Sequence, residues 1–303
     1  MKAAVVGMGS IGARHARILQ TLGCEVSVVS RRPHTEWPVF GSLEELLQQN
    51  PPEYLVIANG TAEHRKTLEQ LAKARFTGTV LVEKPLFEEP MEIPGIPDAR
   101  VFVGYNLRFH PIFESLHARL QTERVLSVQV YVGQYLPDWR PGTDYTRSYS
   151  ASRARGGGVL RDLSHELDYL CWLLGPWQAV AAVSGQYGSL DIDSEDTVGV
   201  LLETSGCPVI SLQMNYLDRV GRREIIINTD GRTLKADLVA GELIDGHDAA
   251  SMTVSRDYTY RAQHEAIMGA DPDPVCTVEE GLETVRLIAA IEKATKAECW
   301  VRR

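Results

Sequence analysis

The sequence lacks the features that mark membrane, nucleic-acid-binding and disulfide-stabilised proteins. No apolar run reaches the roughly 18 residues that a membrane-spanning helix needs. Acidic side chains outnumber basic ones by 40 to 31, giving a net charge of −9 without any basic block. We therefore expect neither a nucleic acid nor an anionic membrane as a partner. The N-terminus, MKAAVVGMGSIG, does not have the pattern of a signal peptide.

Cysteine is also scarce, and its placement excludes several kinds of site. The 5 cysteines are Cys24, Cys171, Cys207, Cys276 and Cys299. They are odd in number, scattered, and without the spacing of metal ligands, which predicts reduced thiols in a cytoplasmic protein with no metal site. The chain also has no G-x-S-x-G turn of the kind that holds a hydrolase serine.

What the sequence does have is length and a regular alternation of strands and helices. A chain of 303 residues is long for one core, so we expect two domains. We place a dinucleotide-binding domain at 1–110 and a substrate-binding and oligomerisation domain at 111–303, connected by a helix after Pro111.

A glycine-rich turn near the N-terminus predicts a dinucleotide site. Lys2 to Val6 is an apolar strand, and the turn Gly7-Met8-Gly9-Ser10-Ile11-Gly12 follows it and leads into a helical pattern and a second strand. In this context Gly7 allows a tight turn, Gly9 lets the backbone approach a pyrophosphate, and Gly12 lets helix and strand pack closely. The alternative, a glycine turn used only for packing, is weaker because the motif lies between a strand and a helix.

The end of the second strand indicates which cofactor is bound. An acid there would bind the ribose 2′-hydroxyl of NAD, but the chain reads Ser30-Arg31-Arg32. Ser30 and one arginine can hold a 2′-phosphate while the other arginine stacks on adenine, so we favour NADP over NAD. The alternative is that both arginines are solvated loop charges.

Further alternation predicts a parallel, doubly wound sheet, whose ligands bind beyond the carboxyl ends of the strands. This rule selects the loops 7–12, 59–64 and 83–87. The second contains Asn59, Gly60 and His64, and the third contains Glu83, Lys84 and Pro85. Lys84 is the best-placed cation near the expected nicotinamide ring.

Together these motifs resemble the Gfo/Idh/MocA family of oxidoreductases. The resemblance rests on GMGSIG, Ile57 to His64, Glu83-Lys84-Pro85, Gly104 to Pro111, and the glycine run 156–158. It implies a Rossmann domain followed by an α/β domain with a large, mostly antiparallel open sheet. The second half agrees independently, because runs such as 126–135, 196–204, 208–217 and 223–238 are β-rich, and 278–297 has helical spacing.

The resemblance also implies roles for particular residues. Lys84 would bind the reacting hydroxyl and tune its proton transfer, while Glu83 shapes the loop. Asn106 and Arg108 would contact the cofactor or the domain junction, although Arg108 pairing with an acid is an equal alternative. From its aromatic and polar composition, the loop 137–145 predicts substrate contacts by Arg140 and Tyr145.

The stretch GGGVLRDLSHELDYL, residues 156–170, predicts a helix with two faces. Leu163, Leu167, Leu170 and Leu174 form an apolar stripe, while Asp162, His165, Asp168, Tyr169 and Trp172 lie opposite and are expected to face a cleft. Together with the resemblance, this predicts that His165 is the general acid/base. The alternative is that these side chains are only the polar side of an amphipathic helix. The family spacing puts an aspartate four residues before the histidine, whereas Asp162 is three before, so a local bulge is needed for Asp162 to take that place. Spacing to Asp168 is kept. His15, His117 and His264 occur singly on helical patterns, which is typical of exposed or structural histidines rather than of ligands.

The sequence therefore predicts an NAD(P)-dependent oxidoreductase that acts on a hydroxyl of a sugar, a sugar derivative, which can be nucleotide-linked, or a cyclitol. One alternative keeps the cofactor but uses transient oxidation to permit elimination or hydrolysis. Another is a catalytically silent dinucleotide-binding regulatory protein. The resemblance further implies a homodimer or homotetramer.

Overall fold

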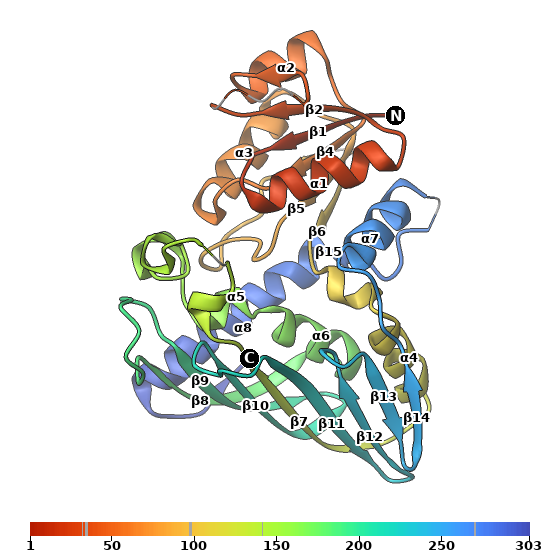
Figure 1. The fold of residues 1–303 in the computed structure, drawn as a ribbon, viewed down its shortest axis with the longest axis vertical. Coiled ribbons are helices and arrows are strands. Elements are labelled where there is room, and N and C mark those ends of the chain that lie inside the picture. Colours follow the sequence, from red (N-terminus) through yellow and green to blue (C-terminus); the bar gives the residue numbers. More distant parts are fainter. Residues whose placement is uncertain (32, 34–35, 97–98, 141, 270) are drawn as a thin grey trace. The chain divides into compact units, whose positions relative to one another are not determined.

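The computed structural model describes residues 1–31, 33, 36–96, 99–140, 142–269 and 271–303. They form two compact units (Figure 1). The first unit comprises Met1–Phe109 and Arg256–Val285, and the second comprises His110–Ser255 and Arg286–Arg303. Arg256–Val285 thus returns to the first unit, whereas the limits expected from the sequence, 1–110 and 111–303, are continuous.

The first unit is built on a seven-stranded sheet with the order β15-β6-β5-β4-β1-β2-β3. Its strands are β1 (Lys2–Val6), β2 (Glu25–Val29), β3 (Val39–Phe40), β4 (Tyr54–Ile57), β5 (Thr79–Val82), β6 (Arg100–Val103) and β15 (Cys276–Thr277). Its helices are α1 (Ser10–Thr21), α2 (Leu43–Gln49), α3 (Thr61–Lys73), α7 (Tyr258–Met268) and the start of α8 (Val278–Ala297). All neighbouring strands are parallel except β15, which runs antiparallel to β6.

Alternate residues of β1 build two cores, one on each face of this sheet. Ala3 and Val5 belong to a buried cluster that includes residues of α1 and α7. Ala4 and Val6 belong to the other cluster, which includes residues of α2 and α3. Helices cover both faces, which explains why the strands are mostly apolar and confirms the expected doubly wound architecture.

The second unit contains a nine-stranded sheet with the order β14-β13-β12-β11-β7-β10-β9-β8-β16. Its strands are β7 (Val125–Gly133), β8 (Trp177–Gly185), β9 (Thr197–Thr204), β10 (Cys207–Asn215), β11 (Arg222–Thr229), β12 (Thr233–Asp237), β13 (Glu242–Asp245), β14 (Asp248–Ser251) and β16 (Val301–Arg302). Only β7 and β10 pair in parallel, so the prediction of a large, mostly antiparallel sheet is confirmed.

This second sheet has one covered and one open face. In β9, Val198, Val200 and Leu202 are buried, whereas Leu201 between them is 49% exposed. Helices α4 (Pro111–Leu120) and α6 (His165–Leu174) lie along the covered face (Figure 1). The alternation of buried and exposed side chains follows from covering a sheet on one side only.

The helix expected over GGGVLRDLSHELDYL is broken. A short α5 (Val159–Asp162) ends at Asp162, and α6 begins at His165. The amide of Ser164 donates to the carbonyl of Arg161, which is three residues earlier rather than four. The chain is therefore wound more tightly between the two helices than in an α-helix. Prediction of one continuous helix was therefore wrong, and side-chain directions across the break do not follow from 100° per residue.

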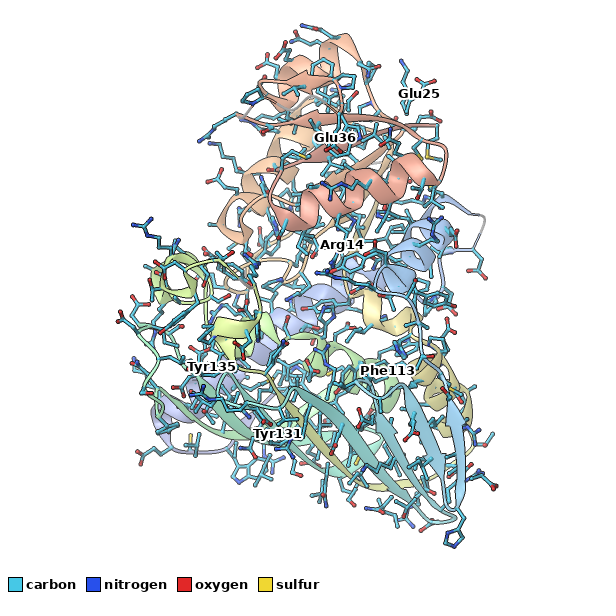
Figure 2. The ribbon with its side chains drawn as sticks, in the orientation of Figure 1. Arg14, Glu25, Glu36, Phe113, Tyr131 and Tyr135 are labelled. Atoms are coloured by element: carbon cyan, nitrogen blue, oxygen red, sulfur yellow. The ribbon has the colours of Figure 1, made fainter. Side chains whose placement is uncertain are left out.

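The apolar stripe was correctly identified, but its opposite face differs from expectation. Leu167 and Leu170 are fully buried. Tyr169 packs on Phe113 with ring centroids 4.3 Å apart, and Trp172 stacks on His117 at the same separation (Phe113 is labelled in Figure 2). These two aromatic side chains therefore pack against α4 instead of facing a cleft.

Candidate active site

The glycine turn Gly7–Gly12 is shaped by close backbone contacts. Gly7 has a φ of 94°, in the region that favours glycine. A Cβ on Gly12 would lie 1.9 Å from the carbonyl oxygen of Gly7, so this turn and α1 approach too closely for any side chain. A Cβ on Gly9, in contrast, would meet nothing within 4 Å. The turn is therefore closely packed at Gly7 and Gly12 and open at Gly9.

The start of α1 fits a bound pyrophosphate. Gly9 caps the helix without a side-chain hydrogen bond, and the first turn, with Ser10 and Ile11, contains no acidic residue. The N–H groups of a helix N-terminus and its dipole attract anions, and a bare glycine cap leaves them accessible. These residues fit the phosphates of a dinucleotide cofactor. The open space at Gly9 would let a pyrophosphate come close to the backbone of Gly9.

The residues that are expected to distinguish NADP from NAD follow β2. Ser30 is half-buried, and its amide donates to the carbonyl of Phe40 at 3.1 Å, whereas Arg31 is exposed. Arg32 lies outside the described residues. No acidic residue occupies the end of β2, as the sequence already indicated.

The loop 59–64 leads from β4 into α3, whose cap is again a glycine without a side-chain hydrogen bond, Gly60. Asn59 donates through Nδ2 to Thr67 Oγ1 at 3.0 Å, but its buried Oδ1 finds no donor among the residues described. His64 is 1% exposed, and burial lowers its pKa, so the ring is neutral. Its Nδ1 lies 3.0 Å from the carbonyl oxygen of Leu86 and donates to it, which ties this loop to the next.

The Glu83-Lys84-Pro85 turn follows β5, and the Lys84–Pro85 peptide bond is cis. Lys84 is half-buried and its amide donates to Glu83 Oε2 at 3.1 Å. Burial alone would raise the pKa of Glu83, but a hydrogen bond from His15 and the charge of Lys84 outweigh it and lower the pKa. The glutamate is therefore a carboxylate.

Asn106 and Arg108 lie in a short 3₁₀ helix, η1 (Asn106–Phe109), and hold the returning segment. Asn106 Nδ2 donates to Thr259 Oγ1 at 2.7 Å. The buried Arg108 guanidinium donates to Glu280 Oε1 at 3.1 Å. Arg108 therefore pairs with an acid, and both partners belong to the first unit. Their predicted contacts with the cofactor stay predictions.

In the second unit, Asp162 is held by two tyrosines. The Tyr216 hydroxyl donates to Asp162 Oδ2 at 2.6 Å, and the Tyr149 hydroxyl donates to Oδ1. Burial, and then the charge of Asp162, raise the pKa of Tyr216 well above its usual value, so Tyr216 keeps its proton and donates. His165 is half-buried at the start of α6, and Asp168 is 2% exposed one turn later.

One acid in the same stretch has a structural role that sequence reasoning missed. Glu166 is fully buried, and Arg223 of β11 donates to both of its oxygens, at 2.7 and 3.2 Å. Such a bidentate pair anchors α6 on the covered face of the sheet. The position of this acid, between His165 and the buried Leu167, indicated that it could be buried and paired. Its partner could not be identified from the sequence because it is 57 residues away in the chain.

Aromatic side chains surround the loop that was expected to bind substrate. Arg140 is exposed, and the Tyr145 hydroxyl accepts from the amide of Asp191 at 3.2 Å. Near the end of β7, the Arg219 guanidinium stacks 3.5 Å above the ring of Tyr135 (Tyr135 is labelled in Figure 2). Trp139 meets Tyr216 edge-on at 5.2 Å.

Two other kinds of feature are absent from the part of the chain that the structure describes. It contains no cluster of three or more potential metal-ligating side chains, and none of its helices is long and apolar enough to cross a membrane. All five cysteines are free thiols.

Comparison with known proteins identifies the family. The profile of the oxidoreductase family with an NAD-binding Rossmann fold matches residues 1–96, and that of the GFO/IDH/MocA C-terminal domain matches residues 120–234. The chain belongs to the Gfo/Idh/MocA family of oxidoreductases. Inositol 2-dehydrogenase of Rhizobium meliloti is 26% identical over 162 residues, which are 50% of this chain and 46% of that protein. The chain thus spans less than half the length of the curated relatives it matches.

Solved structures of other proteins share the fold. GenD2 from gentamicin A biosynthesis, in complex with NAD, has a TM-score of 0.82 at 23% identity, and the match covers 100% of this chain and 96% of that one. The WlbA dehydrogenase from Bordetella pertussis, in complex with NADH and UDP-GlcNAcA, has a TM-score of 0.84 at 19% identity, with 100% and 97% covered.

Proposed function

We propose that this protein transfers hydride between a nicotinamide cofactor and a hydroxyl or keto carbon of a sugar, a sugar derivative or a cyclitol. The observation that carries the proposal is the N-terminus of α1, where Gly9 caps the helix without a side-chain hydrogen bond and leaves open space. The strand before this turn, β1, belongs to the same sheet as β5, which the Glu83-Lys84 turn follows. When bound there, the cofactor would accept or donate the hydride. The family's Rossmann fold supports the same interpretation.

In this proposal, the chain's own residues move the proton and hold the charge. Lys84 binds the reacting oxygen and stabilises the charge that develops on it. His165 transfers the proton of that hydroxyl, as a general acid or base. Asp162 and Asp168 lie close to His165 in sequence, and we assign Asp162 to orienting it and Asp168, with Arg140 and Tyr145, to substrate binding.

The substrate class rests on relatives and on the loop chemistry. Proteins that match this chain include inositol 2-dehydrogenase and a dehydrogenase solved with UDP-GlcNAcA. The aromatic and cationic side chains around 135–145 suit such polar ring compounds. The five free thiols suit a reducing compartment, and we place the protein in the cytoplasm.

For the cofactor, we expect NADPH to bind at least about 10-fold more tightly than NADH, because Ser30 and the arginines after β2 favour a 2′-phosphate. Arg31→Ala should weaken NADPH binding by about 10-fold and change NADH binding by less than about 2-fold, since a charge-assisted hydrogen bond is lost only with the phosphate. Thermal shift and fluorescence titration with both cofactors measure this.

Arg124→Ala provides the matched control, because it removes an arginine whose side chain is 80% exposed in the second unit. Stabilisation by NAD and not by NADP would contradict the cofactor assignment. Adding a panel of inositols, hexoses and nucleotide sugars, and following absorbance of the reduced cofactor, tests the oxidoreductase assignment itself. Binding without turnover across the panel would count against it.

We also propose a homodimer or homotetramer formed through the open face of the nine-stranded sheet. Val183, Leu201 and Trp300 line a hollow on this face and are 66%, 49% and 54% exposed. Burying such a patch stabilises an assembly, so Leu201→Glu is expected to shift the protein to monomer in sedimentation velocity. Val239→Glu, an exposed valine in the turn after β12, should leave the assembly intact. A wild-type monomer at micromolar concentration would refute the proposal.

A further inference from the structure

Four buried side chains form a continuous hydrogen-bonded chain inside the first unit. Glu83 follows β5, His15 lies on α1, His264 lies on α7, and Tyr54 lies on β4. His15 Nε2 is 2.8 Å from Glu83 Oε1, and His15 Nδ1 is 2.8 Å from His264 Nε2. Tyr54 Oη is 2.8 Å from His264 Nδ1. Both histidines are fully buried, so no water competes for these bonds.

The direction of each hydrogen bond follows from the chemistry of the two ends. Glu83 is a carboxylate and can only accept, so His15 Nε2 carries a proton and donates. Burial raises the pKa of Tyr54 well above its usual value, so its hydroxyl keeps a proton. Burial lowers the pKa of His264 well below the ordinary value, so His264 has one N–H.

With His15 neutral, one set of donors satisfies every atom of this chain. The Tyr54 hydroxyl donates to His264 Nδ1, His264 Nε2–H donates to His15 Nδ1, and His15 Nε2–H donates to Glu83. All bonds then point toward the carboxylate, and each strengthens the next.

Contacts on the far side hold the same carboxylate against β6. Glu83 Oε2 accepts from the amide of Lys84, and a Cβ on Gly104 would lie 3.0 Å from Glu83 Oε1. A side chain at Gly104 would therefore crowd the carboxylate. Tyr260 meets His15 edge-on, and Arg14, labelled in Figure 2, stacks over Tyr260 at 5.1 Å and covers the network.

Stability alone does not account for this arrangement. Exchanging protein–water for protein–protein hydrogen bonds gains little, and a buried polar network is at best about as stable as well-packed apolar side chains of similar volume. What the network does provide is orientation, since it fixes both oxygens of Glu83 and thereby the backbone of the next residue, Lys84.

We propose that His15 and His264 are positioning residues that hold the Glu83-Lys84 turn and thereby place Lys84 for its reaction. Neither histidine touches substrate in this role; both act through Glu83. The importance of Lys84's placement rests on the proposed function, but the positioning of the turn does not.

Two substitutions at His15 distinguish the hydrogen bond made by its Nε2 from the one made by its Nδ1. Glutamine can place an amide N–H near the position of Nε2 and keep the bond to Glu83, whereas asparagine reaches only the position of Nδ1 and loses it. We expect deuterium exchange of the Lys84 amide to accelerate about 10- to 100-fold in His15→Asn, the factor for losing one hydrogen bond to a charged group. In His15→Gln it should stay within about 3-fold of wild type.

Tyr54→Phe, which keeps nearly the same volume, tests the far end of the chain and should speed exchange at Lys84 by about 2-fold or more. His247→Asn, an exposed histidine in the second unit, should change nothing. With a turned-over substrate, kcat should fall in His15→Asn and recover in His15→Gln, while KM and cofactor affinity hold.

Unchanged exchange at Lys84 in both His15→Asn and Tyr54→Phe would overturn the proposal, as would a His15→Gln variant that exchanges as fast as His15→Asn. The exchange measurement needs neither cofactor nor substrate. If the exchange pattern is as expected but no cofactor binds, the positioning role stands and the proposed function fails. If cofactor binding and turnover are normal but exchange is unchanged, the proposed function stands and the positioning role fails.

Discussion

The Lys84→Met variant is expected to bind its nicotinamide cofactor normally and to turn over about 10²- to 10⁴-fold more slowly than wild type. Methionine keeps the length and packing of the side chain but has neither the positive charge nor the hydrogen-bond donors. Binding of the cofactor should survive, because the glycine turn at the start of α1 and the backbone of the Glu83-Lys84 turn are unchanged. The loss should therefore appear in kcat.

The measurement is steady-state turnover with whichever sugar or cyclitol stabilises the wild-type protein, together with a cofactor titration. Lys66→Met is the matched control, because Lys66 is an exposed lysine of α3 in the same unit. His165→Asn should produce a loss of similar size and flatten the pH dependence of kcat, since the proton-transfer group is removed. Full turnover by either Lys84→Met or His165→Asn would remove that residue from the mechanism.

Gly9→Ala and Gly12→Ala are expected to separate cofactor binding from folding. Gly9 has an ordinary φ of −75°, and a Cβ there meets no protein atom, so Gly9→Ala should fold as stably as wild type. Its methyl group would occupy the space needed by the pyrophosphate. Losing two or more charge-assisted hydrogen bonds predicts cofactor binding weaker by about 100-fold or more.

Gly12→Ala should fail in a different way. Its Cβ would lie 1.9 Å from the Gly7 carbonyl oxygen, so α1 must move away from the turn. Overpacking of this kind costs about 1–3 kcal/mol or more, and the free energy of unfolding should fall together with cofactor affinity. Thermal melts with and without cofactor measure both effects. Gly231→Ala, where nothing lies within 4 Å, should behave as wild type. Tight cofactor binding by Gly9→Ala would rule out this turn as the pyrophosphate site.

Local rules were enough to predict the two sheets. The strands of the first unit are mostly apolar because both faces are covered, and those of the second alternate because one face is open. Likewise, the glycine turn is a local motif whose spacing and context can be recognised along the chain. These features depend on neighbours within one strand–turn–helix unit.

Features that depend on distant partners could not be predicted. His15 and His264 occur singly on helical patterns, yet 249 residues of sequence separate two nitrogens that lie 2.8 Å apart. The residues on either side of the helix break before His165 also have distant partners. Asp162 is held by Tyr216 and Glu166 is held by Arg223, and no periodicity in residues 156–170 contains either partner. At such positions tertiary contacts override the local pattern.

The return of Arg256–Val285 to the first unit has a consequence for how the protein is made. A ribosome has produced most of the Rossmann strands long before His264, Thr259 and Glu280 exist, so His15, Asn106 and Arg108 must wait for their partners. A nascent chain ending at Phe109 would carry those polar groups in an unfinished core. The first unit is therefore begun first but completed only when Val285 has been made, after strands β7 to β14 of the second unit are available.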